Sequence, residues 1–173
     1  MRVSLKTPLM LVDDADLVRT SRENPRYRFE REDDGAILVS PTHTNGGAKS
    51  LEAAAQLREY KLRVGGKAFD SSTGFAIGPD RRVYSPDASW VSADRIDALS
   101  AEAAAGFWPL SPDVAIEVCS DSDDLSELAA KIERYVERGS EYAIAIDPAT
   151  RSVVERGRAP EGLVLDVAAI IDA

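Results

Sequence analysis

A strand–helix–strand unit constrains the fold more than any other feature of the sequence. Val114, Ile116 and Val118 alternate with polar or small residues, which is the pattern of a β-strand. Residues 124–138 then place apolar side chains at i, i+3, i+4 and i+7, which predicts a helix with one buried face. A second apolar strand is expected at residues 142–146. Elements in this order predict two parallel strands joined by a right-handed crossover.

The remaining segments predict one mixed sheet flanked by helices. Asp34-Gly35, between two strand-like runs, favours a tight hairpin turn. The length suits a single domain, which we place at residues 1–173. The expected fold class is therefore α/β (α+β), with an N-terminal helix and a β-hairpin ahead of a mixed sheet. Further helices are expected at residues 8–22, 48–63 and 93–105, and further strands at residues 27–31, 36–39, 67–70, 73–77, 82–84, 88–91 and 152–155.

The composition excludes several classes of protein. The shares of hydrophobic residues, 44%, and of charged residues, 29%, are typical of a globular protein. No stretch approaches the roughly 18 apolar residues of a membrane span, and the first residues lack the apolar core of a signal peptide. We therefore expect a cytoplasmic protein without a membrane segment. Cys119 is the only cysteine, which leaves no internal disulfide and no cysteine cluster for a metal.

The net charge of −9 argues against a sequence-independent affinity for nucleic acid. Residues 19–31 and 58–67 are locally basic, but solvated faces of surface elements explain both segments more simply than a binding site does. The one histidine, His43, lies in a polar loop without a nucleophilic partner. We assign it no catalytic role.

Glu117 departs from the pattern of its own strand. A carboxylate buried without a partner is costly, yet Glu117 stands among β-branched residues with no basic neighbour in the strand. Asp87 precedes a second strand, and Lys131 lies at the edge of the apolar face of the following helix. Two carboxylates and a lysine are what metal-assisted cleavage of a phosphodiester requires. Oxygen ligands favour Mg²⁺ or Mn²⁺ over Zn²⁺.

Several landmarks occur together in a particular order along the chain. They are Arg28-Phe29-Glu30, residues 69–75, residues 85–91, residues 112–118, Lys131 with Tyr135 and Gly139, and residues 142–148. With these landmarks the chain resembles the Uma family of restriction endonucleases, a branch of the PD-(D/E)xK nuclease superfamily, from about Tyr27 to Glu155. The resemblance implies a restriction-endonuclease-like fold, DNA as the substrate, and Mg²⁺ or Mn²⁺ as the metal cofactor.

The resemblance also assigns roles to individual residues. Asp87 matches the aspartate of the PD element and Glu117 the acid of (D/E)xK, so these two would bind the metal. Cys119 stands where the motif has its lysine, and the family's lysine from the next helix corresponds to Lys131. Glu30 matches the family's N-terminal acid. The resemblance therefore implies Asp87, Glu117, Lys131 and Glu30 as catalytic residues.

Simpler interpretations of the same residues remain open. Asp113, which also follows a proline, is an alternative PD acid, but four strand residues separate it from Glu117 by roughly 13 Å. Asp87 could merely cap a turn, Lys131 could be an ordinary surface lysine, and alternation by itself makes Glu30 a solvent-facing strand residue. The family often has an acid–histidine pair in a loop where this chain has residues 44–48.

Two hypotheses follow for the function. The first is a Mg²⁺-dependent endonuclease that hydrolyses DNA, with homodimerisation as a further hypothesis. The second is a degenerate nuclease fold that binds DNA or protein without catalysis, which the negative charge, Cys119 and the altered loop at residues 44–48 favour.

Overall fold

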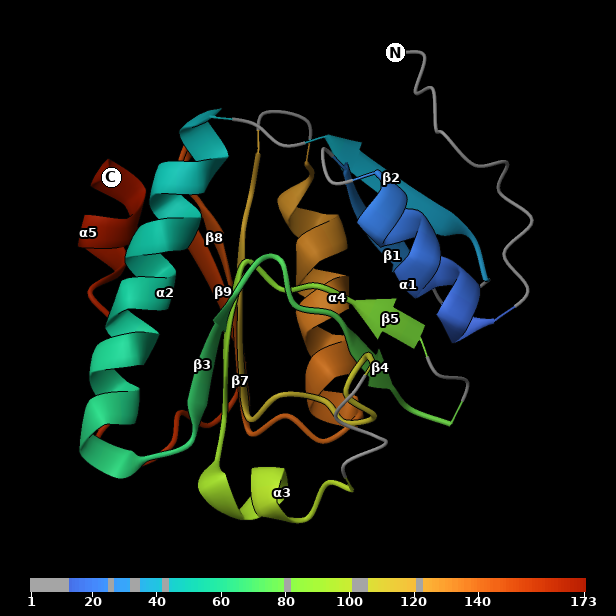
Figure 1. Ribbon diagram of the computed structural model, residues 1–173. Coiled ribbons are helices and arrows are strands. Elements are labelled where there is room, and N and C mark those ends of the chain that lie inside the picture. Colours follow the sequence, from blue (N-terminus) through green and yellow to red (C-terminus); the bar gives the residue numbers. More distant parts are fainter. Residues whose placement is uncertain are drawn as a thin grey trace.

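The structure is a computed structural model that describes residues 13–24, 27–31, 35–41, 44–79, 82–100, 106–120 and 123–173. Its fold is mixed α/β, which confirms the predicted class (Figure 1). The helices are α1 (Asp14–Glu23), α2 (Thr44–Val64), α3 (Ala93–Asp97), α4 (Leu125–Glu137) and α5 (Val167–Asp172). The strands are β1 (Tyr27–Arg31), β2 (Ile37–Pro41), β3 (Lys67–Asp70), β4 (Phe75–Ile77), β5 (Arg82–Tyr84), β6 (Ala88–Val91), β7 (Val114–Val118), β8 (Tyr142–Asp147) and β9 (Ser152–Gly157).

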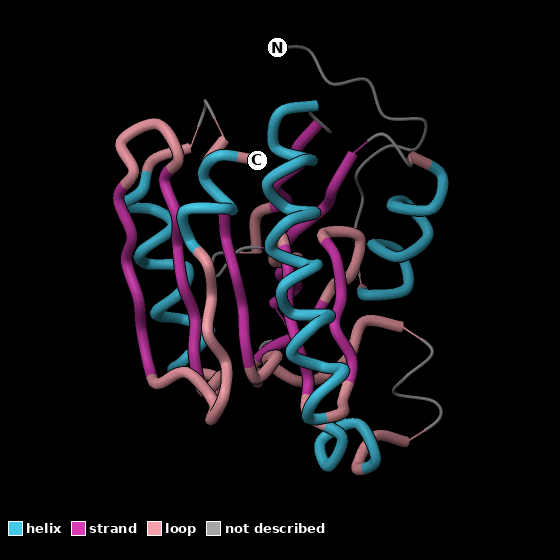
Figure 2. The backbone as a smooth tube through the Cα atoms, turned by 90° about the vertical axis from the view of Figure 1, so that its left-hand side faces the viewer, coloured by secondary structure: helices cyan, strands magenta, loops and turns pink. Residues whose placement is uncertain are grey.

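The larger sheet has five strands in the order β3-β6-β7-β8-β9. Strands β7 and β8 are parallel, with Val114 opposite Tyr142 and Val118 opposite Ile146, so the predicted parallel pair is confirmed. The other neighbours in this sheet are antiparallel. Figure 2 shows its strands running side by side, with helices on both faces.

The smaller sheet has four strands in the order β2-β1-β5-β4, all antiparallel. The predicted hairpin of β1 and β2 is confirmed, with Phe29 opposite Val39. We expected one mixed sheet, whereas the strands form two. The chain leaves the smaller sheet after Tyr84 and enters the larger one at Ala88. Pro86, which has no N–H for a strand ladder, lies in the link and favours this break.

The helices form layers around the two sheets. Helices α2 and α5 cover one face of the larger sheet, and α4 covers its other face and lies between the sheets (Figure 1). Helix α1 packs on the smaller sheet, where Leu17 contacts the cluster of Phe29 and Val83. The two sheets therefore meet through α4.

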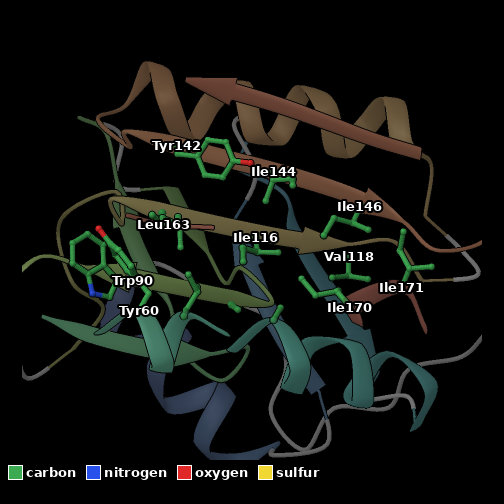
Figure 3. Close-up of a cluster of buried hydrophobic side chains, with 14 residues drawn as sticks. Tyr60, Trp90, Ile116, Val118, Tyr142, Ile144, Ile146, Leu163, Ile170 and Ile171 are labelled. Atoms are coloured by element: carbon green, nitrogen blue, oxygen red, sulfur yellow. The ribbon is translucent and has the colours of Figure 1, made fainter. Parts of the chain in front are cut away.

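The two faces of β7 and β8 carry side chains of different size. Val114, Ile116 and Ile144 lie in the cluster under α2 and α5, which Figure 3 shows with Tyr60 and Trp90 at one end. The face under α4 has alanines instead, at positions 115, 143 and 145. Small side chains let a helix approach closely and leave room for longer side chains from that helix.

Two helix boundaries differ from the prediction. Helix α2 begins at Thr44, within the segment that we predicted as a loop. Thr and Asn are common where helices begin, and burial of Leu57 and Tyr60 further along the helix offsets the cost of two glycines in its first turn. Helix α3 ends at Asp97 rather than running to residue 105, because it has no buried side chain to stabilise it.

Some predictions concern residues outside the described ranges. These are the start of the first helix at residues 8–12, the loop histidine His43 and residues 101–105 of the predicted third helix. The other predicted strands are confirmed, although β4 begins at Phe75 rather than at residue 73.

Candidate active site

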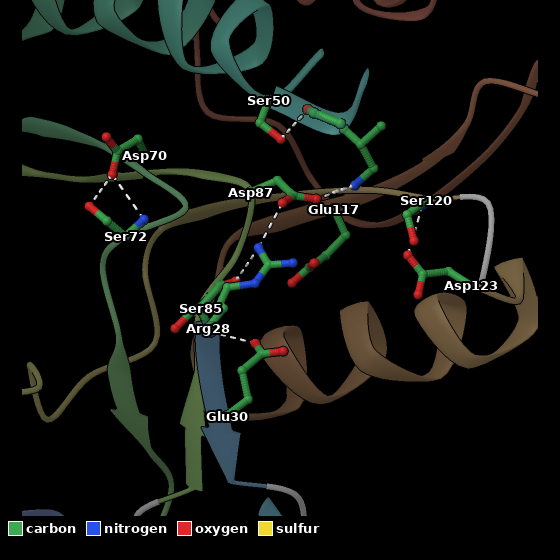
Figure 4. A network of polar contacts seen from close by, with 12 residues as sticks. Arg28, Glu30, Ser50, Asp70, Ser72, Ser85, Asp87, Glu117, Ser120 and Asp123 are labelled. Atoms are coloured by element: carbon green, nitrogen blue, oxygen red, sulfur yellow. Dashed lines mark hydrogen bonds and ion pairs between the residues drawn. The ribbon is translucent and has the colours of Figure 1, made fainter. Parts of the chain in front are cut away.

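Four ionisable side chains converge where the two sheets meet α4. Glu30 comes from β1 of the smaller sheet, Asp87 from the link between β5 and β6, Glu117 from β7 of the larger sheet and Lys131 from α4. Figure 4 shows the three carboxylates directed toward one region, together with Arg28. The structure thus brings together all four residues that the resemblance implied.

Lys131 joins two of the carboxylates. Its Nζ lies 2.8 Å from Oε1 of Glu30 and 3.0 Å from Oε1 of Glu117. The two carboxylate oxygens therefore lie close together, with the ammonium group in contact with both. Without the ammonium group between them, these buried like charges would repel strongly.

Glu30 is buried, contrary to the solvent-facing position that alternation alone suggested. Its neighbour Phe29 is also buried. Strand β1 has two covered faces, because Phe29 packs in the cluster with Leu17 while Glu30 meets Lys131. Oε1 of Glu30 also accepts a hydrogen bond of 2.6 Å from the N–H of Ser85, which fixes the carboxylate against the link that carries Asp87.

Lys131 is buried rather than exposed at the edge of its helix. Its ammonium group lies 5.6 Å from the centre of the Tyr84 ring, an arrangement that favours a cation. Burial by itself lowers the pKa of Lys131, but Glu117 and Glu30 outweigh burial and raise it above its ordinary value. The lysine is therefore cationic at neutral pH.

Both oxygens of Asp87 have partners. Oδ1 accepts a hydrogen bond of 2.8 Å from Nη1 of Arg28, and Oδ2 accepts one of 2.8 Å from the N–H of Val118. The second contact explains the position of Asp87 beside Glu117, because Val118 is the next residue of β7. Strands β6 and β7 are antiparallel, with Ala88 opposite Ile116. This register, extended by one residue, brings Asp87 toward Glu117.

Glu117 is the acid whose ionisation is most perturbed. Burial, assisted by Asp87 and Glu30 and opposed by Lys131 and Arg28, raises the pKa of Glu117 to about 7. Its Oε1 also accepts a hydrogen bond of 3.0 Å from the hydroxyl of Tyr135. Sequence reasoning found Tyr135 only as a landmark, although it lies one helical turn after Lys131 and so on the same side of α4.

The alternative acid, Asp113, lies at the start of β7 and takes part in other contacts. Its Oδ1 accepts a hydrogen bond of 2.7 Å from Arg95, and its Oδ2 accepts one of 2.7 Å from the N–H of Ser92. Asp113 thus ties the start of α3 to the sheet, and the structure does not bring it to Glu117.

Arg28 is a member of the site that sequence reasoning missed. The available signal was its position two residues before Glu30, which places both side chains on the same face of β1. We counted Arg28 among the surface charges, but it contacts Asp87 instead.

Carboxylates of this site could hold a hard metal ion. The described residues contain no cluster of three or more acidic, histidine or cysteine side chains arranged as a metal cage. Mg²⁺, however, commonly uses only one or two protein carboxylates together with water and substrate phosphate. Asp87 and Glu117 supply such a pair, and a carboxylate oxygen that accepts one hydrogen bond retains a lone pair. The residues therefore fit an ion of this kind.

The sequence model of the Uma2 family, described as "Putative restriction endonuclease", matches residues 14–168. The chain belongs to the Uma2 family. All four candidate site residues lie within the matched part of this Uma2 protein. No curated protein is significantly similar to the chain.

A solved structure supports the fold of this Uma2 protein. It is the crystal structure of a protein described as a "putative nuclease belonging to DUF820" from Anabaena variabilis ATCC 29413. The TM-score is 0.64 at 17% identity, over 83% of this chain and 89% of the other. At that identity the likeness establishes the fold alone.

Among the described residues no helix is long and apolar enough to cross a membrane.

Proposed function

We propose that this Uma2 protein is a Mg²⁺-dependent endonuclease that hydrolyses phosphodiester bonds of DNA. The observation that carries the proposal is the convergence of Asp87, Glu117 and Glu30 on one buried region with Lys131 between two of them. Family membership supports the nuclease class. DNA as the substrate, Mg²⁺ or Mn²⁺ as the cofactor and a cytoplasmic location are parts of the proposal.

Asp87 and Glu117 would hold the metal ion in this mechanism. When bound, such an ion supplies an activated water and neutralises charge on the phosphate. Glu117 must be ionised to act as a ligand, and its pKa of about 7 allows this at and above neutral pH. The N–H of Val118 fixes one oxygen of Asp87, so that this acid is positioned before any ligand arrives.

Lys131 and Glu30 would complete the site. An ammonium group held beside the scissile phosphate can donate hydrogen bonds to the attacking water or to the phosphate as negative charge develops. Glu30 holds that ammonium at 2.8 Å and is itself held by Ser85. Glu30 would therefore act by positioning Lys131.

Replacement of Glu117 tests the proposal. Glu117→Gln keeps the shape of the side chain but removes its charge, so we expect loss of Mn²⁺ binding in calorimetry and a fall in DNA cleavage of at least about 100-fold. Glu133→Gln is the matched control, because it removes an exposed acid from the neighbouring helix. Cleavage by Glu117→Gln at the rate of the unmodified protein would overturn the proposal.

One observation favours the second candidate function, a nuclease fold that only binds. Arg28 pairs with Asp87, and Lys131 pairs with Glu30 and Glu117, so that each acid has a positive partner without a metal. Cys119 also replaces the lysine of the motif. A binding module would show no rise in melting temperature with Mn²⁺, whereas the proposed enzyme would show one.

Homodimerisation is a separate proposal that rests only on the need to cut two strands. Light scattering tests it directly. A molar mass near twice the 18.7 kDa of the chain is expected for a dimer, and a mass near that of the single chain would exclude it.

A further inference from the structure

Arg28 uses only part of its hydrogen-bonding capacity in this structure. Its Nη1 donates to Oδ1 of Asp87 at 2.8 Å and to the carbonyl oxygen of Ser85 at 3.5 Å. Among the described residues, its Nε and Nη2 have no acceptor. The Arg28 side chain is partly open to solvent, which leaves these donors available to a ligand.

Arg28 is also the most accessible charged group of the site. Its side chain is 30% exposed, whereas those of Glu30, Asp87, Glu117 and Lys131 are between 3% and 11% exposed. Burial lowers the pKa of Arg28, but Asp87, Glu30 and Glu117 together raise it, so the guanidinium group stays cationic beside Asp87. A ligand that approaches the acids from solvent therefore meets the guanidinium group.

We propose that Arg28 binds the phosphate group of the nucleic acid at this site. Its free Nε and Nη2 would donate to two non-bridging phosphate oxygens, while Nη1 keeps its bond to Asp87. A guanidinium group is planar and presents paired donors that match two phosphate oxygens. The inference rests on the proposed function and names the residue that recognises its substrate.

Arg28 should favour binding of the phosphate but oppose binding of the metal ion. Its permanent positive charge lies 2.8 Å from Asp87, one of the two proposed ligands, and so opposes a cation there. Removal of the charge should strengthen cation binding in the absence of DNA and weaken DNA binding. A residue that only braced Asp87 would instead weaken cation binding when removed.

The chain contains a matched control for Arg28. Arg95 donates from Nη1 to Oδ1 of Asp113 at 2.7 Å and to the carbonyl oxygen of Gly139 at 3.4 Å, and its side chain is 32% exposed. Oδ2 of Asp113 accepts a backbone N–H, as Oδ2 of Asp87 does. The two arginines differ in that Arg95 lies at the opposite end of β7 from the acids.

The test compares Arg28→Gln, Arg28→Lys and Arg95→Gln in two measurements. The first is the salt dependence of binding to a DNA duplex in EDTA, where no cleavage occurs. For Arg28→Gln we expect about tenfold weaker binding and a plot of log affinity against log salt that is shallower by about 1. Arg28→Lys should retain the slope but bind DNA less tightly than the unmodified protein, because lysine keeps the charge and lacks the paired donors of a guanidinium group. Arg95→Gln should match the unmodified protein.

The second measurement is Mn²⁺ binding by calorimetry without DNA. Arg28→Gln should bind Mn²⁺ at least about fivefold more tightly, whereas Arg28→Lys and Arg95→Gln should not change the affinity. An unchanged salt slope in Arg28→Gln, or weaker Mn²⁺ binding, would overturn the inference. The duplex measurement needs neither metal nor catalysis, so it tests the role of Arg28 separately from the nuclease function. The nuclease function itself would be contradicted if the unmodified protein did not cleave DNA.

Discussion

At the scale of single residues, the acids of this site differ in how their charge is balanced. Asp87 and Glu30 each have a cation and a backbone N–H as partners. Among the described residues, Glu117 shares Lys131 with Glu30 and adds only a tyrosine hydroxyl. Burial therefore dominates at Glu117, and its pKa rises to about 7 from an ordinary value of 4.5.

This shift predicts how stability depends on pH. A carboxyl group whose pKa is higher in the folded protein binds its proton more tightly there, so its contribution to stability is present at low pH. That contribution is lost as the pH rises from about 4.5 through about 7. The unmodified protein should thus lose on the order of 2–3 kcal/mol relative to Glu117→Gln between pH 4.5 and pH 8.

Urea denaturation of both proteins at several pH values, without added metal, measures this difference. A difference in the free energy of unfolding that stays constant from pH 4.5 to pH 8 would contradict the assigned pKa shift.

At the scale of secondary-structure elements, one end of the larger sheet has a close backbone approach that requires glycine. Gly157 ends β9 with a φ of +74°, and a Cβ there would lie 2.2 Å from the carbonyl oxygen of Glu141. Gly162 has a similar φ of +77°, but a Cβ there would meet no atom within 4 Å. Comparison of substitutions at these two positions therefore distinguishes backbone strain from a steric clash.

We therefore expect Gly157→Ala to destabilise the protein by more than Gly162→Ala does. Strain at positive φ should cost about 1 kcal/mol in each variant, and the clash should add about 1–3 kcal/mol at position 157. The midpoint of chemical denaturation measures both. Equal losses in the two variants would show that the end of β9 relaxes without cost.

At the scale of the whole molecule, the site also connects the two sheets. Lys131 on α4 contacts Glu30 of the smaller sheet and Glu117 of the larger one, and all three side chains are at most 11% exposed. Removal of the cation would leave two carboxylates buried without their shared partner.

Lys131→Met should accordingly cost about 3–5 kcal/mol at neutral pH. The loss should shrink toward pH 5, where protonation of Glu117, whose pKa is about 7, removes its repulsion from Glu30. Arg156→Met is the control, since the pair of Arg156 and Glu133 is exposed and should contribute less than about 1 kcal/mol. Thermal or urea denaturation of both variants at pH 5 and pH 7.5 measures the effect; a loss of the same size at both pH values would argue for a packing defect instead.

Most of the elements, and the parallel pair at the centre of the fold, could be predicted from the sequence. Periodicity identified β7, α4 and β8, because a buried strand and an amphipathic helix each need apolar residues at a fixed spacing. It also marked Glu117, since a carboxylate in such a strand requires a partner. The resemblance implied Glu30, Asp87 and Lys131 as the remaining members of the site.

How these residues are buried and paired depends on the packing of the elements against one another. Alternation cannot show that β1 is covered on both faces, so it assigned Glu30 to solvent, although Glu30 is 2% exposed. A helical projection likewise put Lys131 at the edge of α4, because it cannot show that the smaller sheet covers that edge. Arg28 and Asp87 are 59 residues apart, and no local pattern indicates that the break at Pro86 brings them into contact. Local sequence fixes the period of each element, whereas the packing of the two sheets against α4 fixes which charges meet.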